Sequence, residues 1–439
     1  MPELSDADSF QFIKHYIKNY HQKPSWYAAS YYDACKVALE AIKKSGIHDA
    51  AIGKKRMDIK DALQSMYHLD YAVKGVMGYH FFNQHGDIQM PMKVAKYKKQ
   101  SLIPGFYEYC LDLKNEYNQD IGKQVLKGDK IIIDQLKMNK TQIVYTGITI
   151  NHINELNISQ QTCMFDFHIW FKYQNDFDPA QIVFENAVEP IKLEKPVVKK
   201  IEKNISICSF HLLGTFKQDF DFRSYPFDHQ QLAIVYRHKT LTNQQLKLIV
   251  DRVDHQLTSD EFIKETNKLN RTKGWELLEE DVYPDIKTYE LQTGINKESS
   301  FSLIHYKASI KRIHMSGMIR HFYPIVTMIM ISCLVIFLPH QKILIKMIII
   351  SAILVANAIY HINVYGLFNT AYITAMEYIH IGFYMIIVYI AFASVFLYSF
   401  HQKKSQKVIR ILSLTIRLLY FFLLVCLGYM VMKMGALWG

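Results

Sequence analysis

The residues best suited to act together form a short turn, Asp221-Phe-Arg-Ser-Tyr-Pro-Phe-Asp228, between two predicted strands. Pro226 fixes its own φ angle and lacks an N–H donor, so it predicts a rigid loop tip. Tyr225 and Phe227 flank it with apolar surface, and Asp228 supplies an anion. The turn therefore combines a stiff backbone, an apolar face and one charge, which suits a contact with another part of the chain.

Arg320 is the last charge before the first long apolar stretch, and it is the cation that we expect opposite Asp228. A partly shielded Asp–Arg pair would couple movement of the strand-rich region to the apolar region. The alternative is an ordinary surface ion pair, worth under about 1 kcal/mol.

Four apolar stretches follow the turn, at Phe322–Pro339, Ile343–Val364, Tyr372–Phe400 and about Leu412–Met432. Each meets or nears the ~20 residues with which a helix crosses ~30 Å of hydrocarbon. From Ser299 onward there are 12 of the 51 Lys and Arg residues but one of the 40 acids, which leaves 39 of each before it. A basic excess confined to the edges of apolar stretches indicates a membrane protein and argues against a nucleic-acid partner. Positive-inside counting places the linkers after the first and third stretches in the cytoplasm and the N-terminal domains outside it.

The turn and the four stretches after it together resemble the pentameric ligand-gated ion channels, the Cys-loop receptors and their bacterial relatives. The stretch Asp166-Phe-His-Ile-Trp170-Phe-Lys-Tyr and the pattern Gly274-Trp275-Glu-Leu extend the resemblance to residues 138–434. The family's two loop cysteines would stand at Gln218 and Leu232, and their absence is similar to the bacterial branch.

The resemblance implies a fold, a partner set and a gating interface. The fold is multidomain, with an all-β extracellular sandwich at 138–320 and a transmembrane domain of four helices at 321–434. Each subunit would join four identical subunits in a bacterial inner membrane and pass permeant ions when an unknown small-molecule or ionic agonist binds. The gating interface would comprise Asp221, Tyr225, Pro226, Phe227, Asp228 and Arg320, and no cofactor is implied.

The second apolar stretch is the candidate pore helix. A continuous helical face is formed by Met347, Ser351, Leu354, Ala358 and His361. Counting back from Tyr372-Ile-Thr puts Ser351 and Leu354 on the family's hydroxyl and leucine rings, and a ring of Leu354 could gate by dewetting. The alternative is that this stripe packs against neighbouring helices.

Ion selectivity rests on charges near the same helix. No acid occurs between Pro339 and Glu377, so no carboxylate ring can draw cations. If Lys342 or Lys346 faced the axis, five ammonium groups would favour anions. The alternative is that both reach lipid headgroups, as we also expect of Arg417 inside the fourth stretch.

Residues 1–112 are expected to form an α/β unit with a helix at Ser25–Ser45, stopped by Gly46, and a hairpin around Gly75–Asp87. The motifs Tyr32-Asp33-Ala and Gly75-x-x-Gly78 resemble the C-terminal part of periplasmic solute-binding proteins of the branched-chain amino-acid type. The alternative is a small unrelated α/β cap, and residues 113–137 are expected to be a linker. Because no signal sequence starts the chain, we expect it to be the tail of a longer natural product or a recombinant piece.

The remaining candidates are aromatic residues and cysteines. Trp170, Tyr236 and Trp275 would line an agonist cavity between subunits, or else belong to the sandwich core. The six cysteines form no CxxC pair, so free thiols are expected and no metal site. There is no phosphate loop, HExxH motif or nucleophile elbow, which argues against an enzyme. Two alternatives to a channel stay open: a non-conducting membrane solute sensor, and a transporter subunit, which should show inverted repeats.

Overall fold

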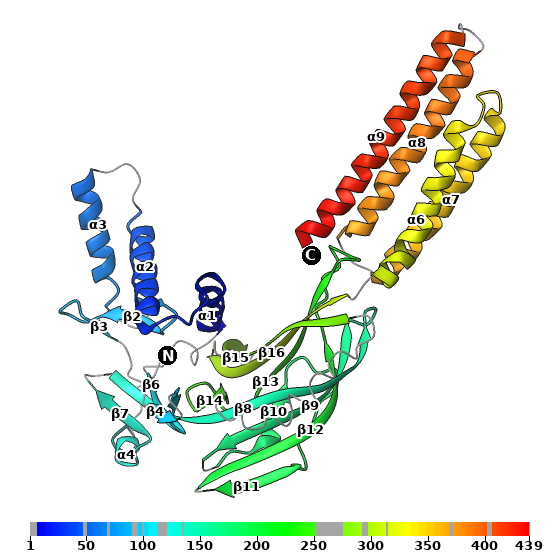
Figure 1. Cartoon of the computed structure of the whole chain (residues 1–439). Helices are drawn as coiled ribbons and strands as arrows, with labels where there is room; N and C mark the ends of the chain where they lie inside the picture. The colour runs from blue at the N-terminus through cyan, green and yellow to red at the C-terminus, as the bar shows by residue number, and fades with distance from the viewer. Residues whose placement is uncertain are drawn as a thin grey trace.

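The computed structural model of the chain describes most of its length (Figure 1). The described residues are 7–46, 51–67, 71–89, 95–98, 101–111, 121–133, 136–174, 176–202, 204–251, 275–291, 297–312, 315–368, 372–401 and 406–438. Within these ranges the chain forms N-terminal helices with short strands, a strand-rich middle and four C-terminal helices. A multidomain layout is therefore present.

The described residues of the N-terminal unit form three helices and five short strands. The helices are α1 (Ala7–Tyr20), α2 (Trp26–Lys44) and α3 (Ile52–Gln64), and the strands are β1 (Val73–Lys74), β2 (Tyr79–Phe82), β3 (Ile88–Gln89), β4 (Ala95–Lys98) and β5 (Ser101–Pro104). The helix expected at Ser25–Ser45 is confirmed, because Ser25 caps α2 by accepting the Ala28 N–H. The expected hairpin is confirmed by the antiparallel pairing of β2 with β3.

Two main sheets form the strand-rich middle. The larger contains β6 (Tyr107–Leu111), β7 (Lys130–Ile133), β8 (Leu136–Asn157), β9 (Thr162–Tyr173), β11 (Val198–Glu202), β12 (Ile205–Lys217) and β14 (Leu246–Val250). The smaller runs in the order β10 (Ile182–Phe184), β13 (His229–His238), β16 (Lys297–Arg312), β15 (Trp275–Leu291). Neighbouring strands are antiparallel except β14, which lies parallel to β8.

The two sheets pack face to face because alternate residues of their strands are apolar. In β9 every second side chain is buried, which is the period that a half-buried strand requires. Its Phe167 and Phe171 contact Phe184 and Tyr236 of the smaller sheet, with ring centroids 5.8 and 6.4 Å apart. The core is thus aromatic and joins both sheets.

Residues 113–137, expected to be a linker, contain α4 (Ile121–Leu126) and β7. Both β7 and β6, which precedes the expected sandwich boundary, pair with β8. The larger sheet therefore begins earlier in the chain than residue 138, because the long β8 offers an edge to both strands. Helix α1 also rests on the smaller sheet, where Phe10 stacks on Tyr283 of β15 at 4.7 Å.

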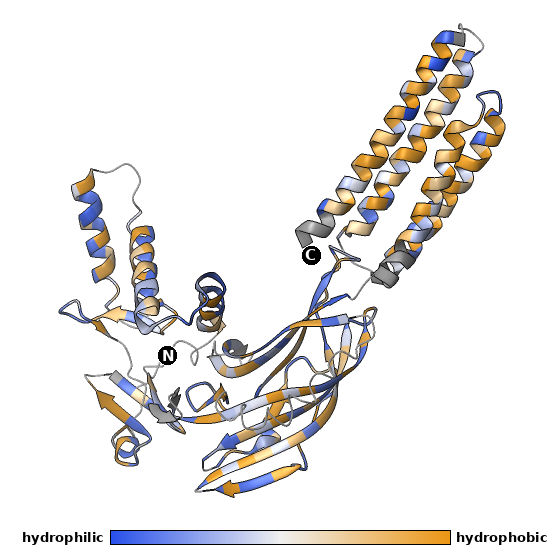
Figure 2. Cartoon of the chain, in the orientation of Figure 1, coloured by the Kyte–Doolittle hydropathy of each residue, from blue (hydrophilic) through white to orange (hydrophobic). Residues whose placement is uncertain are grey.

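The C-terminal helices are α6 (Met315–Phe337), α7 (Ile343–Phe368), α8 (Ala375–His401) and α9 (Gln406–Trp438). Three of them, α7, α8 and α9, are long and apolar enough to cross a membrane, and the apolar part of α6, Phe322–Phe337, is shorter. Apolar residues cover the helices along their length, whereas strands of the sheets mix polar and apolar positions (Figure 2). The chain is therefore a membrane protein.

Candidate functional site: the junction between the sandwich and the apolar helices

The turn at 221–228 is closed by hydrogen bonds within itself. The N–H of Tyr225 donates to the Phe222 carbonyl and that of Phe227 to the Ser224 carbonyl, at 3.0 and 2.8 Å. The Gln230 carboxamide joins the two ends of the turn. Its oxygen accepts the Asp221 N–H at 2.9 Å, and its nitrogen donates to the Asp221 carbonyl at 2.8 Å and to Asp228 Oδ2 at 2.6 Å. The expected rigid turn is therefore held from within, and Pro226 at its tip follows a cis peptide bond.

Asp228 is 0% exposed and pairs with Arg312, the last residue of β16. The guanidinium Nε donates to Oδ1 at 2.8 Å and a terminal nitrogen donates to Oδ2 at 3.2 Å. The same guanidinium lies over the Trp275 ring at 4.4 Å and the Tyr225 ring at 5.1 Å. This two-pronged, charge-assisted pair fixes the turn to the strand that leads into α6.

Arg320 lies in α6, but its side chain lies outside the described residues, so the predicted Asp228–Arg320 pair stays a prediction. Sequence reasoning missed Arg312. The feature that points to Arg312 is its position in the strand register. It pairs with Trp275, and it continues the line of buried alternate residues Ala308 and Ile310. A cation continuing the buried face of a strand requires a buried anion nearby.

The turn also touches the starts of two apolar helices. The Phe222 N–H donates to the Tyr372 hydroxyl at 2.9 Å, and the Ala375 N–H donates to the Arg223 carbonyl at 2.7 Å. Phe227 contacts Phe322 of α6, with ring centroids 6.1 Å apart. The junction thus binds one turn of the sandwich to α6 and to the start of α8.

Helix α7 buries one face against its neighbours and leaves another open. The buried face consists of Lys346, Ile350, Ile353, Asn357 and Val364. Of the five predicted pore residues, Ser351 and Leu354 are exposed, while Met347, Ala358 and His361 are half-buried. The most exposed line of the helix, Ile348, Val355, Ile359 and Ile362, lies one residue further round. The predicted stripe therefore occupies the edge of the open face.

His361 turns toward α8. Its ring stacks on His380 at 4.9 Å, and its Nε2 lies 3.9 Å from Glu377 Oε1. The Nδ1 of His380 lies 2.8 Å from Asn357 Oδ1. Asn357 Nδ2 and His380 Nε2 are buried without a partner, so this polar group between α7 and α8 keeps unused hydrogen-bonding capacity.

The sequence analysis offered lipid headgroups as the surroundings of Lys346 and Arg417, whereas in the structure both side chains line a cavity between the helices. Lys346 is 2% exposed and faces the inside of the helix bundle, whereas Lys342 is exposed. Arg417 is half-buried, with its guanidinium 4.8 Å from the Phe337 ring centre. Neither side chain extends freely from the bundle, because both line a cavity between the helices.

The three candidate cavity aromatics lie apart. Tyr236 is 0% exposed in the sandwich core, where its hydroxyl bonds to Thr146 Oγ1 at 2.9 Å. Trp275 lies under Arg312 at the junction end. Trp170 is half-buried on the opposite face of β9 from the core, over Gly147, where an added Cβ would come within 2.0 Å of the indole. Within one chain these residues do not form a common cavity.

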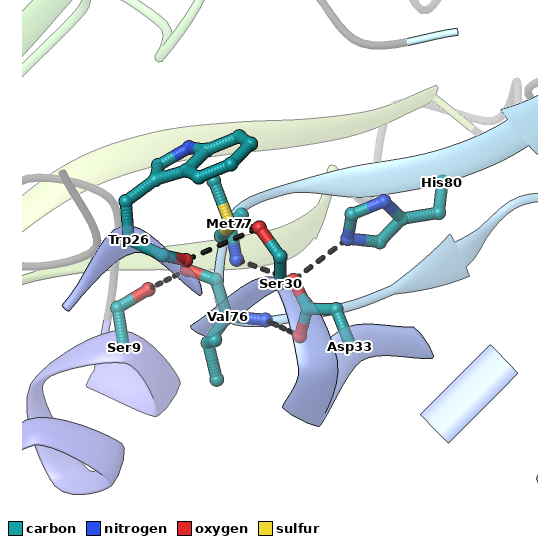
Figure 3. Close-up of polar contacts among 7 residues, drawn as sticks. All are labelled: Ser9, Trp26, Ser30, Asp33, Val76, Met77 and His80. Carbon is teal, nitrogen blue, oxygen red and sulfur yellow. Dashed lines mark hydrogen bonds and ion pairs between the residues drawn. The ribbon is translucent and has the colours of Figure 1, made fainter. Parts of the chain in front are cut away.

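A second polar cluster lies in the N-terminal unit and brings together two motifs singled out in the sequence (Figure 3). The buried carboxylate of Asp33 accepts the N–H groups of Val76 and Met77 at 2.7 and 2.9 Å and pairs with His80 Nε2 at 2.7 Å. At Gly75 an added Cβ would lie 2.4 Å from Asp33 Cγ. The carboxylate accepts three hydrogen bonds from this turn and its neighbouring strand, so the cluster fastens the turn after β1 to α2.

The pKa of Asp33 follows from these contacts. Burial alone would raise it, but the hydrogen bonds from His80, Met77 and Val76 outweigh burial and hold the pKa of Asp33 below its ordinary value. The Asp33 carboxylate is therefore charged at neutral pH.

Other expectations concern cysteines and metals. All six cysteines are free, as expected. Among the described residues, no three His, Cys, Asp or Glu side chains gather into a metal site. No protein-family model matches the chain, and no curated protein matches it either.

Proposed function

We propose that the chain is one subunit of a homopentameric ligand-gated ion channel, with α7 lining the pore. The observation that carries the proposal is the junction: a turn of the sandwich, held by Asp228 and Arg312, binds the starts of α6 and α8. Ligand binding in the sandwich would displace this turn, and the displacement would reach the helices through these contacts.

The open face of α7 supports the pore. Leu354 is 40% exposed in the single chain, and Ser351 one turn before it is also exposed. In a ring of five identical subunits a head-to-tail interface repeats until it closes, so one face of α7 would line the axis. A ring of Leu354 side chains would then form an apolar constriction that dewets when narrow.

The experiment is single-channel recording of the purified protein in a planar bilayer, in asymmetric salt, with a screen of amino acids, protons and divalent cations. We expect ligand-dependent current whose reversal potential gives the ion selectivity. Native mass spectrometry in mild detergent should show five copies, and a monomer or dimer would contradict the proposal.

The variant Leu354→Ser sharpens this test. We expect it to hydrate the constriction and raise spontaneous opening roughly tenfold, the equivalent of about 1.4 kcal/mol in the gating equilibrium. The matched control is Leu418→Ser, which makes the same change at an exposed position of α9. Equal currents in the two variants would place Leu354 against protein or lipid.

A non-conducting membrane sensor is the second candidate, because the most exposed line of α7 consists of Ile and Val, which suits lipid as well as a neighbouring subunit. In a sensor the same turn would relay ligand binding to the helices without a pore. A protein that binds a ligand and carries no current in the bilayer would favour this alternative.

A further inference from the structure

A small cavity lies inside the helix bundle, at the end where α7 begins and α8 finishes. It is lined by residues of all four helices, including Ile336 of α6, Lys346 of α7, Ser394 of α8 and Arg417 of α9. Its volume is about 10 Å³, close to the space of one water molecule. Two cations and the hydroxyl groups of Ser394 and Ser413 thus face a space for a single small species.

The two cations have no carboxylate among the described residues. Lys346 is 2% exposed and lines the cavity. The Nε of Arg417 is buried without a partner. The guanidinium stays charged in proteins, so at least one permanent positive charge faces the cavity.

The part of the chain that forms the apolar helices offers a single candidate for the missing anion. From Ser299 onward its only acidic side chain is Glu377. That carboxylate caps the other end of α8, where it accepts the Thr374 N–H at 2.7 Å. Ser394 lies 17 residues further along the helix, which corresponds to about 25 Å at the α-helical rise.

Two histidines lie near the cavity. His340, in the loop between α6 and α7, lies 6.3 Å from His401 between ring centroids, and the Nδ1 atoms of both are buried and unpartnered. Burial, followed by the charges of Lys346, His401 and Arg417, lowers the pKa of His340. The surroundings of the cavity are therefore electropositive, and no carboxylate among the described residues lines it.

We propose that the cavity is an anion-binding site that takes one ion of halide size. A buried charge needs a partner of opposite sign. A cavity of about 10 Å³ excludes a whole phosphoryl group, which leaves a monatomic anion, seated by small movements of the lining side chains, as the occupant. The ammonium of Lys346 and the guanidinium of Arg417 supply the charge, and the hydroxyls of Ser394 and Ser413 supply neutral donors. The site lies within one subunit, so it does not depend on the chain conducting ions.

The test is thermal unfolding of the purified full chain in detergent, with sodium chloride or bromide against sodium gluconate at equal ionic strength. A ligand that binds only the folded state raises the melting temperature in a saturable way. We expect chloride and bromide to raise it by roughly 3 °C or more over gluconate. Equal melting temperatures in the three salts would overturn the proposal.

The variant Lys346→Met should lose the chloride-dependent shift. Its matched control is Lys342→Met, which removes an exposed lysine one helical turn away and should keep the shift. Loss of the shift in both variants would mean general surface screening and would overturn the site. If Lys346→Met fails to fold, Ser394→Ala tests the same cavity and should lower the apparent chloride affinity severalfold.

An anionic phospholipid could supply a phosphate oxygen instead of a halide. A second experiment adds phosphatidylglycerol or phosphatidylcholine to the chloride-free protein and measures the melting temperature. We expect no difference in melting temperature between the two lipids that depends on Lys346. Stabilisation by phosphatidylglycerol that disappears in Lys346→Met would overturn the halide in favour of a lipid phosphate.

Discussion

Two half-buried arginines of this protein stand in opposite electrostatic situations. Arg312 at the junction meets the buried carboxylate of Asp228 with two hydrogen bonds. Arg417 in the helix bundle shares a cavity with Lys346 and finds no carboxylate among the described residues. The chain thus pairs Arg312 with its own carboxylate, and this pair fixes a turn. It leaves Arg417 without a carboxylate in the part that the structure describes, so that an anion from outside the chain can pair with it. Buried pairs and buried lone charges should therefore respond differently to substitution.

The largest effect is expected at the completed pair. Replacing Asp228 with Ala leaves Arg312 largely buried without its anion, which should lower the free energy of unfolding by about 3 kcal/mol. Denaturant or thermal unfolding of the purified chain measures this. The control is Asp221→Ala, which breaks the exposed pair with Arg223 and should cost under about 1 kcal/mol. Equal losses in both variants would remove the distinction between buried and surface pairs.

A double-mutant cycle then decides which arginine Asp228 uses. With Arg312→Ala, the effects of the two changes on unfolding should be strongly non-additive, because the two side chains share their hydrogen bonds. With Arg320→Ala, coupling in the ligand response tests the pair predicted from the sequence. Additive effects in the second cycle would assign the junction to Arg312 alone.

The buried carboxylate of Asp33 is a second charge that has all its observed partners within the chain. Asp33→Ala leaves two backbone donors and His80 without an acceptor and should lower the free energy of unfolding by about 2–3 kcal/mol. Gly75→Ala should act in the same direction, because its Cβ would overlap the carboxylate. A matched control is Gly53→Ala in α3, where an added Cβ meets nothing within 4 Å.

The same carboxylate predicts a pH dependence. Because the pKa of Asp33 is lowered in the folded chain, its stabilisation is complete above the ordinary carboxyl value of about 3.9 and is lost as the pH falls through the lowered value. Hydrogen exchange of the Val76 and Met77 amides, corrected for intrinsic rates, should show constant protection from pH 7 to 5 and loss below about 4. In Asp33→Asn this transition should be absent.

The smallest effect is expected at the unpaired charge. In chloride-free buffer, Lys346→Met should change the free energy of unfolding by under about 1 kcal/mol or increase it, because an apolar side chain of similar length relieves repulsion from Arg417. A loss as large as that of Asp228→Ala would mean that Lys346 already has an anion in the protein. The comparison between the two arginines would then fail.

The sequence predicted the turn, the alternating strands and the apolar helices, because each follows from local residue pattern and period. It did not predict the partner of Asp228. The last charge before an apolar stretch is easy to find, whereas Arg312 becomes a candidate only once the strand register places it beside Trp275. Register depends on contacts between distant residues, which one sequence does not display.

The sequence was also unable to decide which face of helix α7 is buried. A period of 3.6 residues predicted a stripe through Ser351 and Leu354, and both are exposed. It could not decide that Lys346, one residue from Met347, points into the bundle, because nearly every position of α7 is apolar and no polar face orients the helix. Similarly, an aromatic residue in a strand is either core or cavity, and only the packing of two sheets assigned Tyr236 to the core.

The hydrogen bond from the Ala375 N–H to the Arg223 carbonyl has a consequence for where α8 begins. The first N–H groups of a helix have no partner in the helix itself. Here Thr374 serves the Glu377 N–H, while the sandwich supplies the acceptor for Ala375. The turn at 221–228 is therefore part of the N-terminal cap of a membrane helix. If the turn withdrew, the first turn of α8 would lose an acceptor and would fray, which would shorten the helix by up to about 5.4 Å.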